Sequence, residues 1–429
     1  MKIYSFIFLL ILGFFFGCKE DQSSTEYNRL RMPADEKISL VSTNKMTGEE
    51  RRINLDSSQG NVLFYKMDSD PSEDVPSLKQ LIAQMVGGEN TSKKTQEIRL
   101  KQGVLKLIHL DSDSRYYSRL KYQWQDPRHP ELQKLIDSEK LAYLIKDKAE
   151  IESFEILMNW VRRQWQPSTP NPYPDWNGNT ILKMIRSKQT GGFCGQYSQL
   201  LSQALTGLGY QTRYLWLKNH FALEVYSNTL DKWICLDPFY NTVYKKGDIY
   251  CNAYEVYAAV HAGLEIISCV NTANQELIEG DSRQKILSHY ERFIIDLKNN
   301  HLEERRQGVS YVQDFWSHSA VLADMNLQQY DFADGYPLMV PNLSDLYTGI
   351  NQSSIRIEAV NSEWLSLSFK TNTVFHKVFE ISLDGGENYK EISNVSVRVP
   401  VRKGLQKIHL RSVNVMGVKG AVARLVYEY

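Results

Sequence analysis

Three residues whose side chains can together carry out nucleophilic chemistry occur in the order Cys194, His220 and Asp237. A thiolate is a strong nucleophile, an imidazole can take up and return a proton, and a carboxylate can hold the imidazole in one tautomer. Such a set could attack an acyl carbonyl and form a thioester. The alternative interpretation is a buried structural thiol and a packed histidine, so the elements that position the three residues decide between the two.

A helix is predicted to begin at Cys194. Apolar residues recur at i, i+3, i+4 and i+7 along one face, and Gly209 is placed to end the helix. Backbone N–H groups at a helix start have no intrahelical acceptor and carry partial positive charge, which favours a thiolate over a thiol. Glycines at 191, 192 and 195 keep the approach uncrowded. The position therefore favours a reactive sulfur.

His220 and Asp237 fall on two predicted strands, 220–226 and 232–237, in which apolar and aromatic residues dominate. With a four-residue loop at 227–230, the two residues would face each other across a hairpin. Cross-strand partners have Cβ atoms about 4.5–5.5 Å apart, which suits a hydrogen bond between a carboxylate and an imidazole. The other ring nitrogen would then face the sulfur.

The same register makes Glu224 face Trp233 and places Glu224 on the side of the sheet that carries His220. Two interpretations of this carboxylate stay open: an acceptor behind the reacting groups, or an exposed side chain at a sheet edge.

These segments resemble the transglutaminase-like domain of the papain-like cysteine enzyme superfamily. The resemblance lies in Gly-Phe-Cys-Gly before a helix, His-Phe-Ala-Leu-Glu-Val-Tyr, and Trp-Ile-Cys-Leu-Asp-Pro, and covers about residues 116–300. It implies an α+β fold in which the helix bearing the cysteine packs on an antiparallel sheet bearing the histidine and aspartate. It also implies that Cys194 is the nucleophile, His220 the general base and then general acid, and Asp237 the orienting carboxylate.

The tetrahedral intermediate of such a reaction needs hydrogen-bond donors for its oxyanion. The backbone N–H of Cys194 is the first expected donor, and the candidates for the second are Gln189 and the indole of Trp176. Their alternative interpretations are a solvated loop amide and a core residue. No zinc-ligand spacing, phosphate-binding loop or nucleotide fingerprint occurs in the sequence, so neither a metal nor a cofactor is expected.

The N-terminal residues predict export. The apolar run Phe6–Phe16 is too short to span a membrane but suits the core of a signal peptide. With Phe-Phe-Gly-Cys at its end, it resembles a bacterial lipoprotein signal, which implies cleavage before Cys18 and acylation of that residue. The Lys-Glu-Asp that follows is similar to the acidic export tag of Bacteroidetes surface lipoproteins. We therefore expect a lipid anchor in the outer membrane, with the protein exposed at the cell surface or facing the periplasm.

The implied reaction is attack on an amide or peptide bond of a peptide, protein or glycopeptide, with water or a second amine resolving the thioester. Hydrolysis is slightly favoured over cross-linking, because an envelope enzyme sits in water and nothing in the sequence specifies an amine acceptor. The competing interpretation is a catalytically silent lipoprotein that keeps the fold and binds a glycan or peptide.

Composition agrees with a globular protein of several parts. The chain has 429 residues, of which 42% are hydrophobic and 23% charged, enough for about two or three cores. Its formal net charge is zero, which argues against nucleic acid as a partner. Four cysteines besides Cys18 are too sparse for a disulfide scaffold.

Together with the two resemblances, composition and periodicity divide the chain into six expected parts: a signal peptide (1–17), a tether (18–36), an N-terminal accessory region (37–115), the transglutaminase-like domain (116–300), a linker region (301–353) and a β-sandwich (354–429). Helices are expected within 154–165, 180–185, 253–264 and about 283–297. The alternating strands of the last part are similar in pattern to immunoglobulin-like or fibronectin-like modules, and we favour a spacer or cap over a binding module there.

Overall fold

The computed structural model describes residues 96–100, 103–112, 118, 120–303, 318–323, 325 and 337–429, and four short strands nearer the N-terminus. These strands are β1 (Arg29–Leu30), β2 (Ile38–Thr43), β3 (Glu50–Leu55) and β4 (Leu63–Phe64). β1 pairs with β4, and β2 pairs with β3. The predicted signal peptide, Cys18 and most of the tether lie outside the described residues.

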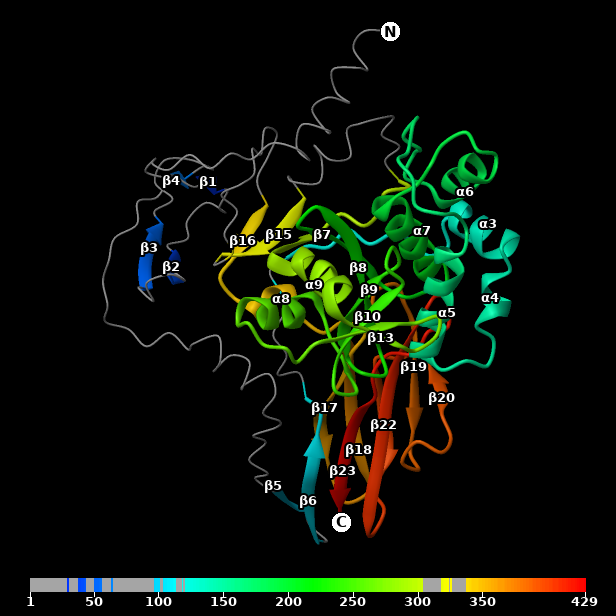
Figure 1. Cartoon of the computed structure of the whole chain (residues 1–429). Coiled ribbons are helices and arrows are strands. Elements are labelled where there is room, and N and C mark those ends of the chain that lie inside the picture. The colour runs from blue at the N-terminus through cyan, green and yellow to red at the C-terminus, as the bar shows by residue number, and fades with distance from the viewer. Residues whose placement is uncertain are drawn as a thin grey trace.

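The fold mixes helices and sheets, and a ten-stranded sheet forms its centre (Figure 1). Its order is β13-β12-β10-β9-β8-β7-β14-β15-β16, with β11 paired to β10. The strands are β7 (Thr212–Leu217), β8 (His220–Ser227), β9 (Lys232–Asp237), β10 (Thr242–Lys246), β11 (Ile249–Tyr250), β12 (Ser268–Asn271), β13 (Leu277–Ile278), β14 (Phe293–Asp296), β15 (Ser319–Leu322) and β16 (Leu338–Val340). Of these neighbours, only β15 and β16 run parallel among the described residues.

Helices cover both faces of this sheet. In Figure 1, α3 (Pro130–Ser138), α4 (Leu141–Leu144), α5 (Glu150–Arg162), α6 (Gly178–Arg186) and α7 (Cys194–Gly207) gather on one side, and α8 (Ala253–His261) and α9 (Gly280–Ser288) on the other. Leu223 and Val225 of β8 join the core of the first group, whereas Ala222 joins the core of the second. Successive strand residues point to opposite faces, so a strand buried on both sides is almost wholly apolar.

The predicted helix at 283–297 is wrong in its second half. α9 ends at Ser288, a 3₁₀ turn η1 (His289–Glu291) follows, and β14 then pairs antiparallel with β7. All four residues of β14 are buried. A short apolar run that fills both faces of a sheet cannot be told from a buried helix by periodicity alone. The turn places His289 beside the start of β8, where its Nδ1 lies 2.8 Å from the carbonyl oxygen of Lys218.

A second unit, the two-sheet unit, contains the C-terminal strands. One sheet holds β17 (Ser353–Val360), β18 (Trp364–Thr371) and β21 (Ser396–Pro400). The other has the order β20-β19-β22-β23-β6-β5, with β20 (Lys390–Ile392), β19 (His376–Ser382), β22 (Leu405–Asn414), β23 (Ala423–Glu428), β6 (Gly103–Leu110) and β5 (Gln96–Leu100). One hydrophobic core joins the two sheets.

Two of the predicted part boundaries do not follow the architecture. β5 and β6 come from the predicted accessory region, yet β6 pairs with β23, and Leu105 packs in the core of the two-sheet unit. β15, β16 and the short α11 (Leu343–Leu346) fall in the predicted linker, yet the two strands extend the ten-stranded sheet. Pairings over such sequence distances leave no local pattern.

Within the described residues, no helix is both long and apolar enough to cross a membrane.

Candidate active site

Cys194 is the first residue of α7 and is partly exposed. The start of the helix is fixed by three hydrogen bonds. The Phe193 N–H donates to Gln196 Oε1 at 3.1 Å, the Ser198 hydroxyl donates to the Phe221 carbonyl at 3.1 Å, and a tyrosine hydroxyl, that of Tyr214, donates to the Gly195 carbonyl at 2.9 Å. The last two bonds tie the first turn of α7 to β8 and β7, so the helix start that carries Cys194 is fixed against the sheet.

The glycines before Cys194 allow close packing. The Gly192 carbonyl accepts hydrogen bonds from the Ser168 N–H at 2.9 Å and from Trp165 Nε1 at 3.2 Å. A Cβ at Gly192 would lie 2.6 Å from Trp165 Nε1, so only glycine fits without displacing the indole. The 166–177 loop therefore lies directly on the approach to α7.

The register of β8 and β9 differs from the prediction. Glu224 pairs with Cys235 rather than Trp233, and the turn is 228–231. Extending this ladder by one pair sets Asp237 opposite Ala222, so the predicted direct pairing of Asp237 with the histidine is wrong by two residues. Because side chains alternate with a period of two, this shift leaves the side chains of His220 and Asp237 on the same face of the sheet.

His220 and Asp237 nevertheless form a buried pair. His220 Nε2 lies 2.8 Å from Asp237 Oδ2, with 4% of the imidazole side chain and none of the carboxylate exposed. Asp237 Oδ1 accepts the N–H groups of Phe239 and Tyr240, each at 3.2 Å, and Oδ2 also accepts the Tyr244 hydroxyl at 3.2 Å. The carboxylate is therefore held in one orientation, in which its Oδ2 can accept the N–H of the His220 imidazole.

Cys194 acts on the same imidazole. Burial alone lowers the pKa of His220, but the charge and hydrogen bond of Asp237, with a further hydrogen bond and charge from Cys194, raise it to about 10. Because Nε2 faces Asp237, Nδ1 is the nitrogen left for Cys194. The structure thus brings the three predicted residues together, and the histidine pKa favours an imidazolium beside the sulfur at neutral pH.

A second histidine lies against the first and was not predicted. The rings of His289 and His220 stack with centroids 4.6 Å apart. Nδ1 of His289 lies 2.8 Å from the Lys218 carbonyl oxygen, and Nε2 lies 3.0 Å from the Tyr240 hydroxyl. Burial and the nearby charge of His220 lower the pKa of His289, which favours its neutral form. No local signal marks this residue, because its contact depends on how α9 returns to the sheet.

The two predicted oxyanion donors differ in placement. Trp176 is partly buried and affects the pKa of the Tyr173 hydroxyl, which the charge of Cys194 also raises. Gln189 is exposed in the loop between α6 and α7, and among the described residues no hydrogen bond joins its side chain to Tyr173 or Cys194. Tyr173 and Gln196 lie at the first turn of α7 and were not predicted.

Glu224 is neither an exposed carboxylate nor an acceptor for the histidine. It is fully buried and accepts a hydrogen bond from Arg213 Nε at 2.7 Å, while its other oxygen accepts the Ala253 N–H at 2.7 Å and the Tyr347 hydroxyl at 3.0 Å. Arg213 is also fully buried and hydrogen-bonds the Leu346 carbonyl. The pair links β7 and β8 to α8 and α11, so its role is structural.

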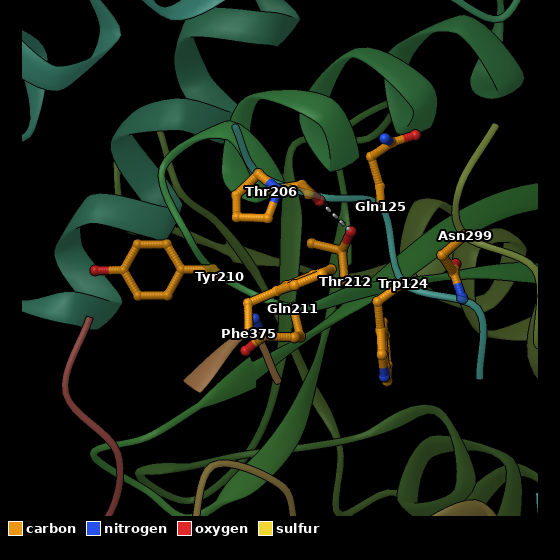
Figure 2. A pocket seen from close by; sticks show the side chains of 9 residues that line it. Trp124, Gln125, Thr206, Tyr210, Gln211, Thr212, Asn299 and Phe375 are labelled. Carbon is orange, nitrogen blue, oxygen red and sulfur yellow. Dashed lines mark hydrogen bonds between the residues drawn. The ribbon is translucent and has the colours of Figure 1, made fainter. Parts of the chain in front are cut away.

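A hollow of about 240 Å³, including space open to solvent, lies elsewhere, near the C-terminal end of α7. Its lining residues come from four parts of the chain: Trp124, Gln125, Pro127, Thr206, Tyr210, Gln211, Thr212, Asn299 and Phe375. Figure 2 shows the Thr206 and Thr212 hydroxyls joined by a hydrogen bond, at 3.1 Å. None of the three predicted reacting residues lines this hollow.

The three described cysteines other than Cys194 are buried thiols. Cys194, Cys235, Cys251 and Cys269 are all free, and burial raises the pKa of Cys235 well above its usual range and those of Cys251 and Cys269 to about 12. In the part of the chain that the structure describes, no group of three or more His, Cys, Asp or Glu side chains could hold a metal ion.

Comparison with known proteins gives only distant structural likeness. No protein-family model matches the chain, and no curated protein matches it. Among solved structures, the crystal structure of red sea bream transglutaminase is similar with a TM-score of 0.22 and 12% sequence identity, over 95% of this chain and 89% of that one.

Proposed function

We propose that this protein is a cysteine-dependent amide hydrolase or acyltransferase of transglutaminase-like type, with a papain-like arrangement of the reacting residues. Cys194 is the nucleophile, His220 the proton carrier and Asp237 the orienting carboxylate. The observation that carries this proposal is the buried hydrogen bond between His220 and Asp237, with Cys194 at a helix start acting on the same ring.

In the first half of the reaction, the thiolate sulfur adds to the amide carbonyl carbon and the C=O π pair moves to oxygen. The oxyanion returns that pair, the C–N bond breaks, and the leaving nitrogen takes a proton from His220. Since the pKa of His220 is raised to about 10, its imidazolium form predominates at neutral pH and can supply that proton.

In the second half, water adds to the thioester and gives its proton to the neutral imidazole. Collapse expels the thiolate and leaves a carboxylic acid, and the imidazolium is restored. An amine in place of water would give a cross-linked amide instead. We favour hydrolysis of peptide, protein or glycopeptide substrates, because no described residue is placed to select an amine acceptor.

We place this chemistry in the cell envelope. The proposal rests on the apolar run Phe6–Phe16 before Cys18 and implies an acylated N-terminus in the outer membrane. The two-sheet unit is proposed as an immunoglobulin-like or fibronectin-like spacer. Labelling of cells with a fatty-acid probe should mark the wild type and not Cys18→Ala, and equal labelling of both would reject the anchor.

The enzymatic proposal is tested with the full chain, as wild type and Cys194→Ala, against a panel of peptide, glutamine and glycopeptide amides. Release of ammonia or amine that requires Cys194 is expected, and an added amine distinguishes hydrolysis from transfer. Cys235→Ala is the matched control, because Cys235 is a buried thiol in β9, the strand that also carries Asp237. Equal turnover by wild type and Cys194→Ala, or none by either, would reject thiol catalysis and leave a binding protein.

A further inference from the structure

We propose that Tyr173 is a catalytic residue: its hydroxyl donates a hydrogen bond to the oxyanion that forms on substrate at Cys194, and Gln196 orients that hydroxyl. This inference rests on the proposed function and deepens it, because it supplies the second oxyanion donor.

The position of Tyr173 places its hydroxyl at the first turn of α7. A Cβ added at Gly195 would lie 3.4 Å from the Tyr173 hydroxyl oxygen, so the phenol is in contact distance of the residue after Cys194. The Tyr173 ring meets Phe193, the residue before Cys194, edge to face with centroids 6.2 Å apart. The hydroxyl therefore lies beside the backbone N–H groups that open the helix, where an oxyanion is best stabilised.

The orientation of the hydroxyl follows from Gln196. Gln196 is buried, and its Oε1 accepts the Phe193 N–H at 3.1 Å, which leaves its amide NH₂ to donate to Tyr173. A phenol oxygen that accepts a hydrogen bond still has its own proton to give. The tyrosine is thus set up as a donor.

The protonation state agrees with that role. The Tyr173 side chain is 43% exposed as a whole, yet burial around its hydroxyl raises the pKa well above the usual tyrosine range. The hydrogen bond from Gln196 lowers the pKa and the negative charge of Cys194 raises it, but both effects are smaller than that of burial. The hydroxyl stays protonated through neutral pH, so it can stabilise an oxyanion without giving up its proton.

In the reaction, Tyr173 acts only while the carbonyl oxygen carries negative charge. When the sulfur adds to the carbonyl carbon, the π pair moves to oxygen, and that oxygen accepts hydrogen bonds from the Cys194 N–H and the Tyr173 O–H. When the C–N bond breaks, the pair returns to the C=O bond. The proton taken by the leaving nitrogen comes from His220, so Tyr173 is unchanged at the end.

The test compares Tyr173→Phe with wild type on the amide of the panel that shows Cys194-dependent release. Loss of one oxyanion donor should lower kcat by about 10²–10³-fold, with KM nearly unchanged. Alkylation of Cys194 by iodoacetamide forms no oxyanion, so its rate should stay within about twofold of wild type. Tyr143→Phe, at a tyrosine that is 76% exposed, is the control and should change neither rate.

A second variant probes the orientation of the hydroxyl. Gln196→Glu keeps the oxygen that accepts the Phe193 N–H but removes the amide NH₂ that donates to Tyr173, and it should lower kcat by less than Tyr173→Phe does. Turnover by Tyr173→Phe at the wild-type rate would overturn the inference and leave the proposed function standing. Parallel loss of turnover and alkylation in Tyr173→Phe would also overturn it, since that pattern reflects packing around Cys194. Absence of Cys194-dependent turnover in the wild type would overturn the proposed function itself, and the inference with it.

Discussion

Asp237 Oδ2 and His220 Nε2 lie 2.8 Å apart, in a pair of which the carboxylate is wholly shielded from solvent. Three further donors, two backbone N–H groups and the Tyr244 hydroxyl, hold the carboxylate in place. The charge of Asp237 therefore acts on the imidazole at short range and in a fixed direction, and several consequences can be measured.

The first prediction concerns that charge. Asp237→Asn keeps the shape of the side chain but removes the negative charge that favours the imidazolium, so kcat should fall by about 10²–10⁴-fold. Cys194 should also react more slowly with iodoacetamide. Asp248→Asn, at an exposed acid beside β11, is the control and should leave both rates unchanged. Wild-type rates in Asp237→Asn would contradict the role assigned to the carboxylate.

The second prediction is a pH dependence of stability. The pKa of His220 is raised from 6.5 to about 10 in the folded state, so the folded protein holds a proton that the unfolded chain releases. The contribution of His220 to the free energy of unfolding has its full value below pH 6.5 and is lost as the pH rises to about 10. Urea unfolding at several pH values should show this decline. Asp237→Asn should flatten it, and an equally steep decline in that variant would contradict the assignment.

The third prediction concerns the buried pair of Arg213 and Glu224. Glu224→Gln leaves the guanidinium buried without its counter-charge, so the free energy of unfolding should drop by about 3–5 kcal/mol. Glu139→Gln provides the comparison, because its partner Arg186 is 44% exposed and such pairs contribute below about 1 kcal/mol. Urea unfolding at neutral pH measures both. Similar losses in the two variants would show that burial of the first pair is not what matters.

The fourth prediction tests whether β6 supports the two-sheet unit. Leu105 is fully buried in that core, so Leu105→Ala should cost about 2–5 kcal/mol of unfolding free energy. Val104, the preceding residue of the same strand, is 39% exposed, and Val104→Ala should cost clearly less. Thermal and urea unfolding of the full chain compare the two. Equal effects would mean that β6 is not an integral strand of the unit.

Local sequence patterns predicted the elements that carry the site. The apolar spacing after Cys194 gives α7 because side chains four residues apart share a helix face, and the two apolar runs that follow form β8 and β9. The hairpin register was predicted two residues out. The side-chain period of a strand is also two, so His220 and Asp237 still share a face.

Only the tertiary structure decided which side chains surround those three residues. Tyr173, His289 and Gln196 reach the site through the packing of a loop, a returning turn and a helix face, and no spacing in the sequence encodes such contacts. The pairing of β6 with β23 was not predicted either, because it joins segments far apart in the sequence, with Leu110 paired to Leu425. Short-range periodicity determines what a segment becomes, because it depends on the segment's own side chains. Which segments meet depends on the burial and hydrogen bonding of the whole molecule.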